Sequence, residues 1–589
     1  MTIGREYITI VEIDVDFCDL TFGSAPCTAA LSSTVARKCF NTRATCKDLA
    51  NIDLGTLTLR FAGNQSGLPK GQTIFPALKS VSERAGEINL SGLDDRTSAL
   101  GKRASVTVQM QDFTYHDTLT DKYQSERVSG AAQQSGVGYD PAAQGTFFGR
   151  LRARWPHWYG RALRVKRGLV GQALAAMETE HYVLTDWKGP DAKGAVTFTA
   201  KDVLKLAEDD NALCPAPSNG VLAEAITIDA TEATLSPSGI GDAEYAASGR
   251  VCIGSEVMTF TRLGDTLTLT GRGVDGTTAA AHSADDSAQE CYHVSNAVIP
   301  DVLEELLVTY AGISSGFIPT ADWTTENHWT TGFGLTTTIT RPTAVSKLIG
   351  EICQLGVSVW WEPTAQEIRY RPNRPLEADE TFYQITDAAN ILEGSGQVEV
   401  SEGQRIGSIY FWHGLIDPTD SATDGNNYRK AVVVTSSAAA NYETSAFKEI
   451  YTRWFGPNGS DAVAATIAER LISRYERAPL TIQMDLDIKD RDSVRIGDLV
   501  QITSRLIQDD AGGGDAHTAQ VKYVKPGAAK ITIKAETYDI EGRFCYWMTD
   551  ASGLPDYDTA TDEDKFDGAF WFDENETDFG DGTTAYIWF

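Results

Sequence analysis

The stretch FCDLTFGSAPCTAALSSTVARKCFNTRATCKDL (17–49) gathers four of the chain's nine cysteines into 29 residues. The other five cysteines are scattered singly over more than 300 residues. Such clustering indicates a cross-linked or metal-bound knot, and the chemistry of that knot decides how the N-terminal part folds. The four cysteines are Cys18, Cys27, Cys39 and Cys46.

Three chemistries compete for these thiols, whose intervening gaps are eight, eleven and six residues. Two disulfides suit the even count if the protein ends up outside cells. Structural zinc ranks behind, because its paired C-x₂₋₄-C knuckles are missing. A [4Fe–4S] cluster takes four thiolates at more variable spacing, and residue chemistry alone ranks it level with disulfides. Four nearby basic residues would stabilise an anionic cluster: Arg37, Lys38, Arg43 and Lys47.

Length and charge limit the class of protein. A chain of 589 residues is too long for one core, and 42% hydrophobic with 22% charged residues is normal for folded domains. The net charge of −30 argues against a groove that grips nucleic acid, although a negative surface would let a polyanion pass without sticking. No run of about 18 apolar residues predicts a membrane span, and the N-terminus does not read as a signal peptide, so we expect folding in a cytosol.

In contrast to the acidic chain as a whole, one segment is basic: FFGRLRARWPHWYGRALRVKRG (147–168). It holds seven Arg or Lys residues with Trp155, Trp158 and Tyr159 between them. Aromatic rings among arginines could stack on bases. The alternative is a pair of strands around the Trp-Pro-His-Trp-Tyr turn, with the arginines on a wet face. The total charge favours that alternative.

Hydrophobic periodicity predicts a multidomain, β-rich α+β fold. Helical patterns occur at 299–312, 341–356 and 460–479, with Ser460 as the N-cap of the third. A four-strand series then predicts a small barrel or sandwich. The expected segments are 1–60 with the cysteine knot, 61–218 as a first β-rich domain, 219–296 as a small all-β insertion, 297–400 as an α+β domain, 401–548 as a helix with a barrel-like domain, and 549–589 as a tail.

The tail combines twelve Asp or Glu residues and the single Lys565 with nine aromatic residues. High net charge and few aliphatic residues argue against an independent core, while the aromatics argue against a mere solubilising tail. We expect this segment to fold onto a neighbouring chain.

Catalytic signatures are weak. There is no H-E-x-x-H motif and no P-loop. GISSG (312–316) has the G-x-S-x-G form around Ser314, but it follows a predicted helix, whereas a nucleophile elbow joins a strand to a helix. His282 is interpreted as part of a β-turn, and His328 as packed or exposed. The sequence therefore favours a non-enzymatic role, with a cell-wall-degrading tail enzyme or an electron-transfer protein as alternatives.

Two motifs resemble proteins of phage tails. VDFCDLTFGSAPCTA (15–29), followed by KCFNTRATCKD (38–48), resembles the tail-tip or baseplate hub proteins of siphophages and gene transfer agents, a family that includes the tail-tip protein of lambda-like phages. In that family four cysteines at similar spacing bind an iron–sulfur cluster. The resemblance implies that Cys18, Cys27, Cys39 and Cys46 are cluster ligands.

IGSEVMTFTRLGDTLTLTGRGVDGTTAAAHSADD (253–286) resembles a β-module that recurs in phage tail proteins. It departs from that pattern at Asp285, where a glycine is common. The matching residues are Gly254, Glu256, Arg272, Gly273, Gly276, Thr277, Ala280 and His282.

The resemblance implies a structural hub of a tail tip or baseplate, located in the virion and assembled in the bacterial cytoplasm. Such hubs form a ring, usually a trimer, that closes the tail tube and forms part of the DNA ejection channel without sequence-specific binding. Implied partners are distal tail and tube proteins, the tape measure protein, and tip or fibre proteins. The cluster is expected to act as a structural staple of the N-terminal segment.

Overall fold

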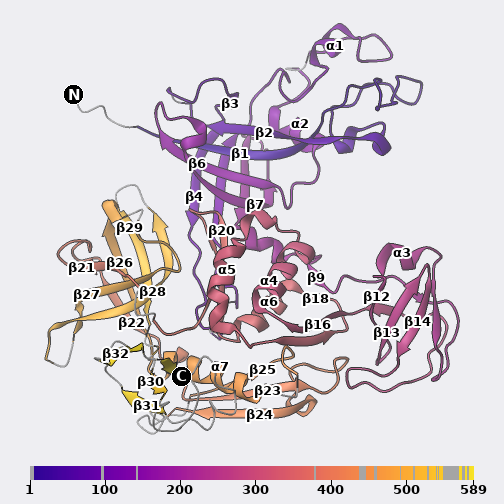
Figure 1. Cartoon of the computed structure of the whole chain (residues 1–589). Helices are drawn as coiled ribbons and strands as arrows, with labels where there is room; N and C mark the ends of the chain where they lie inside the picture. Colours follow the sequence, from indigo (N-terminus) through magenta and orange to yellow (C-terminus); the bar gives the residue numbers. More distant parts are fainter. Residues whose placement is uncertain are drawn as a thin grey trace. The chain divides into compact units, whose positions relative to one another are not determined.

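The structure is a computed structural model, and it describes two compact units. The first unit comprises Met1–Gly86, Arg103–Leu206 and Trp361–Glu367, and the second comprises the remaining residues. The predicted multidomain, β-rich fold is confirmed, since one eight-stranded sheet forms the framework of the first unit and several smaller sheets lie in the second (Figure 1). The described residues are 6–540, apart from 65, 94–97, 141–142, 377–379, 437–445, 457–459, 491–492, 509–510, 527–529 and 539, together with the strand segments 543–547, 570–573, 578–579, 583–584 and 586–588.

An eight-stranded sheet forms the framework of the first unit. Its strand β1 (Tyr7–Cys18) lies between β2 and β6, and the alternating residues Val11, Ile13 and Val15 are buried in the main core. Acidic residues on the other face of β1 form ion pairs with basic residues of the neighbouring strands, so both faces of β1 make contacts within the unit. In sheet order the strands are β3 (Ile74–Phe75), β2 (Leu54–Ala62), β1, β6 (Ala162–Leu169), β7 (Glu178–Lys188), β8 (Ala195–Lys201), β5 (Ser105–Gln111) and β4 (Leu78–Arg84).

The basic segment 147–168 contains a helix that the sequence analysis missed. Residues Phe147–Arg154 form α2, and only Ala162–Leu169 is a strand, so the predicted strand pair is wrong. Phe147, Phe148 and Leu151 share one buried face with Arg154, which is the spacing of a helix. An arginine on that apolar face obscured the helical period. Trp155 and Trp158 of the following turn are buried in the main core.

The loop that carries the cysteines and the segment that contains α1 (Gln124–Ser129) together form a small lobe. We call residues 18–53, which begin at the last residue of β1, and 115–139 the cysteine lobe. Its own core is only a satellite cluster of five buried residues, so apolar burial gives it little stability. Two short 3-10 turns lie in the lobe, η1 (Arg43–Thr45) and η2 (Leu49–Asn51). The buried residues are Phe22, Ala29, Cys39, Tyr123 and Ala132.

In the second unit, the segment predicted as a small all-β insertion (219–296) contains a sheet between Val221 and Glu290, which we call the β-module. A six-stranded sheet and the short helix α3 (Ile240–Glu244) enclose a core of twelve buried residues (Figure 1). In sheet order its strands are β10 (Val221–Leu222), β11 (Glu232–Ser236), β14 (Thr266–Gly271), β13 (Glu256–Leu263), β12 (Ser248–Ile253) and β15 (Ala288–Glu290).

The helices predicted at 299–312 and 341–356 are confirmed. The first is α4 (Ile299–Glu305), which continues as a π-helical turn η5 (Leu306–Tyr310), and the second is α6 (Val345–Cys353). The other elements of this region are α5 (Thr320–Glu326), the hairpin β19 (Val357–Glu362) with β20 (Glu367–Pro372), and the pairs β16 (Tyr292–Ala297) with β17 (Leu335–Ile339) and β9 (Leu213–Cys214) with β18 (Thr343–Ala344).

The third predicted helix is α7 (Asp461–Tyr475), which packs against the sheet of β24 (Tyr428–Thr435), β23 (Ser408–Leu415) and β25 (Phe447–Tyr451) (Figure 1). Ser460 stands at its N-cap, but its side chain makes no capping hydrogen bond. The predicted four-strand series is confirmed as part of a six-stranded sheet. In sheet order that sheet holds β21 (Tyr383–Thr386), β27 (Leu499–Gln508), β28 (Gly514–Pro526), β29 (Lys530–Thr537), β26 (Leu480–Asp487) and β22 (Gln397–Val400).

Much of the tail 549–589 lies outside the described residues, and so do the side chains of its strands. Its backbone strands β31 (Phe570–Asp573) and β34 (Tyr586–Trp588) pair with β30 (Arg543–Trp547), and β32 (Asp578–Phe579) pairs with β33 (Thr583–Thr584). The predicted docking of the tail on a neighbouring chain stays a prediction. Within the described part of the chain, no helix is long and apolar enough to cross a membrane.

Candidate metal centre

Strand β1 delivers the first cysteine of the knot. Cys18 is its last residue, and the Cys18 backbone N–H donates to the carbonyl of Asn41 at 2.7 Å. The side-chain amide of Asn41 donates back to the Cys18 carbonyl at 2.8 Å. Asn41 is buried and takes a left-handed backbone with φ of 56°, a conformation that asparagine tolerates better than most residues. This reciprocal pair ties the first thiol to the loop that carries the third and fourth.

A tight turn presents Cys39 and Cys46 together. The hydroxyl of Thr45 accepts the Phe40 N–H at 3.0 Å, and the Cys46 N–H donates to the carbonyl of Arg43 at 3.3 Å. The Cys46 sulfur in turn accepts the Asp48 N–H at 3.3 Å. Backbone N–H donors to sulfur stabilise thiolates, so this sulfur is already prepared as a ligand.

Asp48 joins the second cysteine to the fourth. Its carboxylate accepts the N–H of Thr28 at 2.6 Å and the Thr28 hydroxyl at 2.9 Å. The Thr28 N–H, followed by the Asn51 side chain, lowers the pKa of Asp48 below its ordinary value. Cys27 precedes Thr28 directly, so these bonds hold the Cys27 segment near Cys46.

All four cysteines line one small pocket, with an empty volume of about 330 Å³ that includes space open to solvent. All four are free thiols. Within the described residues, no group of three or more His, Cys, Asp or Glu side chains is placed to hold a metal ion. The four thiols therefore line one pocket, but their positions do not form a coordination shell around a single ion. The rest of the lining is Leu20, Phe22, Ala29, Asn41, Thr42, Lys47, Asp48 and Ile52.

The chemistry of this donor set favours a cationic guest. Burial raises the pKa of the Cys39 thiol, and the nearby Cys46, Cys27 and Cys18 raise it further, whereas a hydrogen bond from the Asn41 backbone lowers it. Several thiolates in one buried pocket repel one another. Iron or another soft cation would remove that repulsion, so the residues fit a thiolate-bound cluster.

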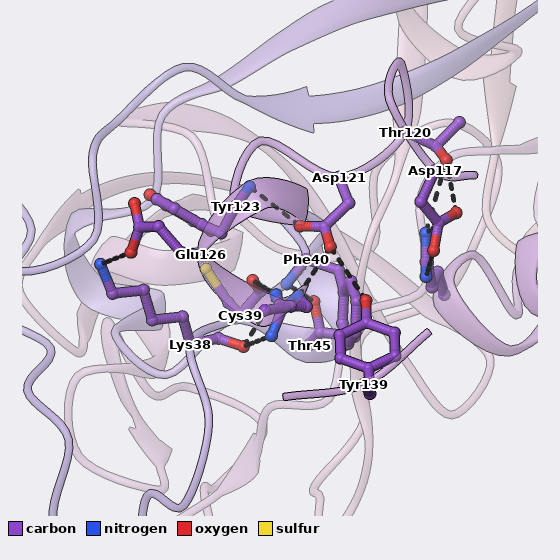
Figure 2. A network of polar contacts seen from close by, with 12 residues as sticks. Lys38, Cys39, Phe40, Thr45, Asp117, Thr120, Asp121, Tyr123, Glu126 and Tyr139 are labelled. Carbon is purple, nitrogen blue, oxygen red and sulfur yellow. Dashed lines mark hydrogen bonds and ion pairs between the residues drawn. The ribbon is translucent and has the colours of Figure 1, made fainter. Parts of the chain in front are cut away.

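The flanking cations expected from the sequence are mostly engaged elsewhere. Lys38 forms an ion pair with Glu126 at 2.7 Å (Figure 2), and the Arg37 guanidinium lies 5.6 Å from the centre of the Phe40 ring. Of the four, only Lys47 lines the pocket. The guanidinium that contacts the Cys39 backbone comes instead from α1: it belongs to Arg127, which the sequence analysis did not single out. No local pattern reveals Arg127, because it lies 88 residues from Cys39 in the chain.

The basic segment 147–168 is neither a base-stacking surface nor a wet face. Five of its seven cationic residues form ion pairs with carboxylates. Burial and pairing leave little basic surface for nucleic acid, which agrees with the total charge. The pairs are Arg150 and Arg154 with Asp117, Arg161 with Asp16, Arg164 with Glu12 and Asp14, and Arg167 with Glu83 and Glu180.

The β-module motif converges on Glu256, whose side chain is fully buried. Its carboxylate accepts two hydrogen bonds from Arg272 at 2.7 and 2.9 Å and contacts the His282 ring nitrogen at 2.8 Å. The N–H groups of Gly273 and Ala280 donate to it at 2.9 Å each. Burial alone would raise the pKa of Glu256, but the bonds from Arg272 and His282 outweigh it and lower the pKa to about 2. The motif therefore describes one buried carboxylate and its donors.

The departure from the motif at Asp285 also has a structural reason. Asp285 has φ of 66°, a left-handed conformation in which glycine carries no steric cost. Aspartate tolerates this region better than most residues, so the turn forms. The Asp285 N–H still donates to the carbonyl of Leu222 at 2.9 Å.

The weak catalytic candidates have structural partners. Ser314 caps the 3-10 turn η6 (Ser315–Phe317) by accepting the Gly316 N–H at 3.3 Å. Its neighbour Gly312, with φ of 67°, ends the preceding helix as predicted. His282 belongs to the Glu256 network, and a ring nitrogen of His328 contacts the carbonyl of Thr325 at 2.8 Å. Among the described residues, the Ser314 hydroxyl is not hydrogen-bonded to a histidine, as it would be in a catalytic triad.

Comparisons with known proteins give similarities at the level of solved structures. No family model matches the sequence, and no curated protein matches it. The chain is similar to a tail protein from Neisseria meningitidis MC58 at 9% identity, over 78% of this chain and 97% of that one, with a TM-score of 0.34. It is similar to the prophage tail protein gp18 from Listeria monocytogenes EGD-e at 11% identity, over 65% and 87%, with a TM-score of 0.29.

A third similarity is to a chain of the native gene transfer agent virion, at 11% identity over 82% of this chain and 86% of that one, with a TM-score of 0.28. Two of the three are described as tail proteins and the third as part of a gene transfer agent particle. Because their TM-scores lie below 0.5, these similarities do not identify this chain's function.

Proposed function

We propose that this chain is a structural hub subunit of a phage or gene transfer agent tail tip, and that its cysteine lobe binds a [4Fe–4S] cluster. The observation that carries the proposal is the convergence of Cys18, Cys27, Cys39 and Cys46 on one pocket. These are the four residues that the resemblance to tail-tip hubs names as ligands. When bound, the cluster supplies cross-links between four points of the lobe.

The chain's own residues support a structural role for that cross-link. The lobe buries only five core residues, whereas the adjoining sheet buries a large apolar cluster. A segment with so little core needs another source of stability, and metal-site binding free energy adds directly to folding. The cluster therefore acts as a staple in this proposal, and not as an electron-transfer centre.

The charge of the chain supports a hub around a DNA channel. The net charge of −30 and the paired arginines of 147–168 both disfavour adhesion to a polyanion. We propose a trimeric ring that closes the tail tube and contacts tube, tape measure, and tip or fibre proteins. Neither a cell-wall-degrading enzyme nor a redox carrier is favoured by a specific contact of the described residues.

Mass photometry of purified full-length protein, followed by electron microscopy of assembled particles, tests the ring. A mass of three chains and threefold rings are expected. A stable monomer that joins no particle would contradict the hub. Deletion of 550–589 is expected to impair assembly while the subunit stays folded by circular dichroism, and a normal yield of infectious particles would refute the docking of the tail.

A further inference from the structure

We propose that Arg127 and Arg154 form a guanidinium clamp on Phe40 that positions Cys39 and provides fixed positive charge for the thiolate-bound cluster. The clamp deepens the proposed function and rests on it. Both arginines come from segments remote from the cysteine loop in sequence. Figure 2 shows the network around Phe40, Cys39 and Asp121.

The stacking on Phe40 is close. The Arg127 guanidinium lies 3.8 Å from the centre of the Phe40 ring, and that of Arg154 lies 4.1 Å from it. Both arginines are buried, at 1% and 6% exposed. Cation–π contacts are strongest where water is excluded. Phe40 directly follows Cys39, so the ring is a handle by which two distant segments hold this cysteine.

Arg127 also grips the backbone beside the thiol. It donates to the carbonyl of Cys39 at 2.6 Å and, through both terminal nitrogens, to the carbonyl of Lys38 at 3.2 Å. Its Nε donates to the Asp121 carboxylate at 2.6 Å, and Tyr139 donates its hydroxyl to the same carboxylate at 3.4 Å (Figure 2). All three nitrogens of the Arg127 guanidinium thus donate hydrogen bonds, which fix its position relative to Cys39.

The clamp carries a surplus of positive charge. Three guanidiniums, those of Arg127, Arg150 and Arg154, face the two carboxylates of Asp117 and Asp121, which leaves a net charge of +1. All five groups are largely buried. Buried cations are stabilised by anions beside them, and a thiolate-bound cluster would be such an anion.

A second cation points to the same place. The Lys122 ammonium donates to the carbonyls of Asp19 and Leu20 at 2.7 and 3.1 Å, and Leu20 lines the thiol pocket. The described lining of the pocket offers only Asp48 as a carboxylate, and Lys47 lies beside it. A cluster ligated by four thiolates is anionic and would be stabilised by these nearby cations.

Three single substitutions in the full-length chain, purified without oxygen, test the clamp. Arg127→Gln removes both the positive charge and the planar guanidinium. Arg127→Lys keeps the positive charge but loses the guanidinium with its several N–H donors. Arg164→Gln is the matched control. Arg164 pairs with Glu12 and Asp14 on the sheet, and none of these three residues belongs to the described lining of the pocket. Iron and sulfide content are measured first, and the reduction potential is then measured by titration monitored by electron paramagnetic resonance.

The clamp predicts that Arg127→Gln makes the potential more negative, because a fixed positive charge favours the reduced cluster. We expect a tenfold fall in the reduced-to-oxidised ratio at fixed potential, which is about 59 mV for one electron. Arg127→Lys is expected to stay near the wild-type potential, and Arg164→Gln to match it. Loss of the cluster from Arg127→Gln but not from Arg164→Gln also supports the clamp.

An unchanged potential and full cluster content in Arg127→Gln would overturn the clamp while leaving the cluster intact. If Arg127→Gln loses its cluster, Arg154→Gln replaces it in the potential measurement, because Arg154 stacks on Phe40 without gripping the Cys39 carbonyl. A wild-type chain that binds no iron and no sulfide would overturn the proposed cluster, and the clamp with it.

Discussion

The cysteine lobe and the β-module are both organised around a buried polar centre, but they differ in how much else holds them together. The β-module surrounds Glu256 with a core of twelve buried residues. The cysteine lobe has five, and Cys39 is one of them. The β-module therefore has an apolar core that stabilises it besides its polar centre. The cysteine lobe has little apolar core and depends on its polar centre for stability.

This contrast explains what each motif specifies. In the β-module four of the recurring residues, Arg272, Gly273, Ala280 and His282, contact the carboxylate of a fifth, Glu256, and all come from one continuous segment. In the cysteine lobe the four cysteines of the motif are free thiols, and the arginine that contacts the Cys39 carbonyl comes from elsewhere in the chain. A self-sufficient network is expected in a recurrent module, whereas open thiols are expected where a ligand completes the structure.

The largest expected effect comes from removing one thiol. Cys39→Ser is expected to lose the cluster and to cost the lobe more than about 5 kcal/mol, because the binding free energy of the cluster adds directly to the folding of the lobe. Hydrogen exchange should accelerate in 18–53 and 115–139 and stay unchanged in β5 and β8. Cys353→Ser, in the buried face of α6, is the control and should leave the lobe unchanged. Equal protection of the lobe in wild type and Cys39→Ser would contradict the staple.

Breaking the polar centre of the β-module should cost less and act only there. Glu256→Gln leaves Arg272 buried without its counterion, and we expect a loss of about 3–5 kcal/mol from the module. Hydrogen exchange in β12 and β13, with the cysteine lobe as internal reference, measures this. A module as stable as wild type would show that Glu256 is not its organising residue.

Acid should weaken the β-module through the same carboxylate. The pKa of Glu256 is lowered to about 2 from an ordinary value of 4.5, so its contribution is complete above pH 4.5 and is lost as the pH falls toward 2. Thermal unfolding of the full chain between pH 5 and 2 should show this slope for the module. In Glu256→Gln the slope should be smaller, and an identical slope would assign it to other groups.

The smallest effect is expected at Asp285. Asp285→Gly removes the steric cost of a left-handed aspartate but adds freedom to the unfolded chain, so we expect a gain below about 1 kcal/mol. Asp285→Ala, which keeps a Cβ without the local hydrogen-bonding carboxylate, should lose about 1 kcal/mol. Thermal unfolding of the two variants measures the difference. A more stable alanine variant would contradict the account of this turn.

The sequence predicted those parts of the fold that depend on near neighbours. The alternation of β1, the stripes of α4, α6 and α7, and the strands from β26 to β29 were all legible, because periodicity over one element reports its buried face. The cysteines lie within 29 residues, so their meeting was predictable too. The α2 helix was missed because Arg154, on its buried face, is satisfied by Asp117 and not by solvent.

Long-range polar partners could not be predicted from the sequence. The flanking cations Arg37 and Lys38 looked suited to a cluster, yet Lys38 is committed to Glu126. The groups that grip Cys39 and Phe40 are Arg127 and Arg154, and no periodicity links them to the cysteine loop. In the β-module, the sequence identified the members of the motif but not that Glu256 is the acceptor they share.

The central claim is that four thiols of a weakly cored lobe hold a cluster. The most direct test is the iron and acid-labile sulfide content, with the Mössbauer spectrum, of full-length protein purified without oxygen. We predict about four iron atoms and four sulfides per chain and the spectrum of a [4Fe–4S] cluster, all absent from Cys39→Ser. Two disulfides among Cys18, Cys27, Cys39 and Cys46, or one zinc ion in place of iron, would contradict the account.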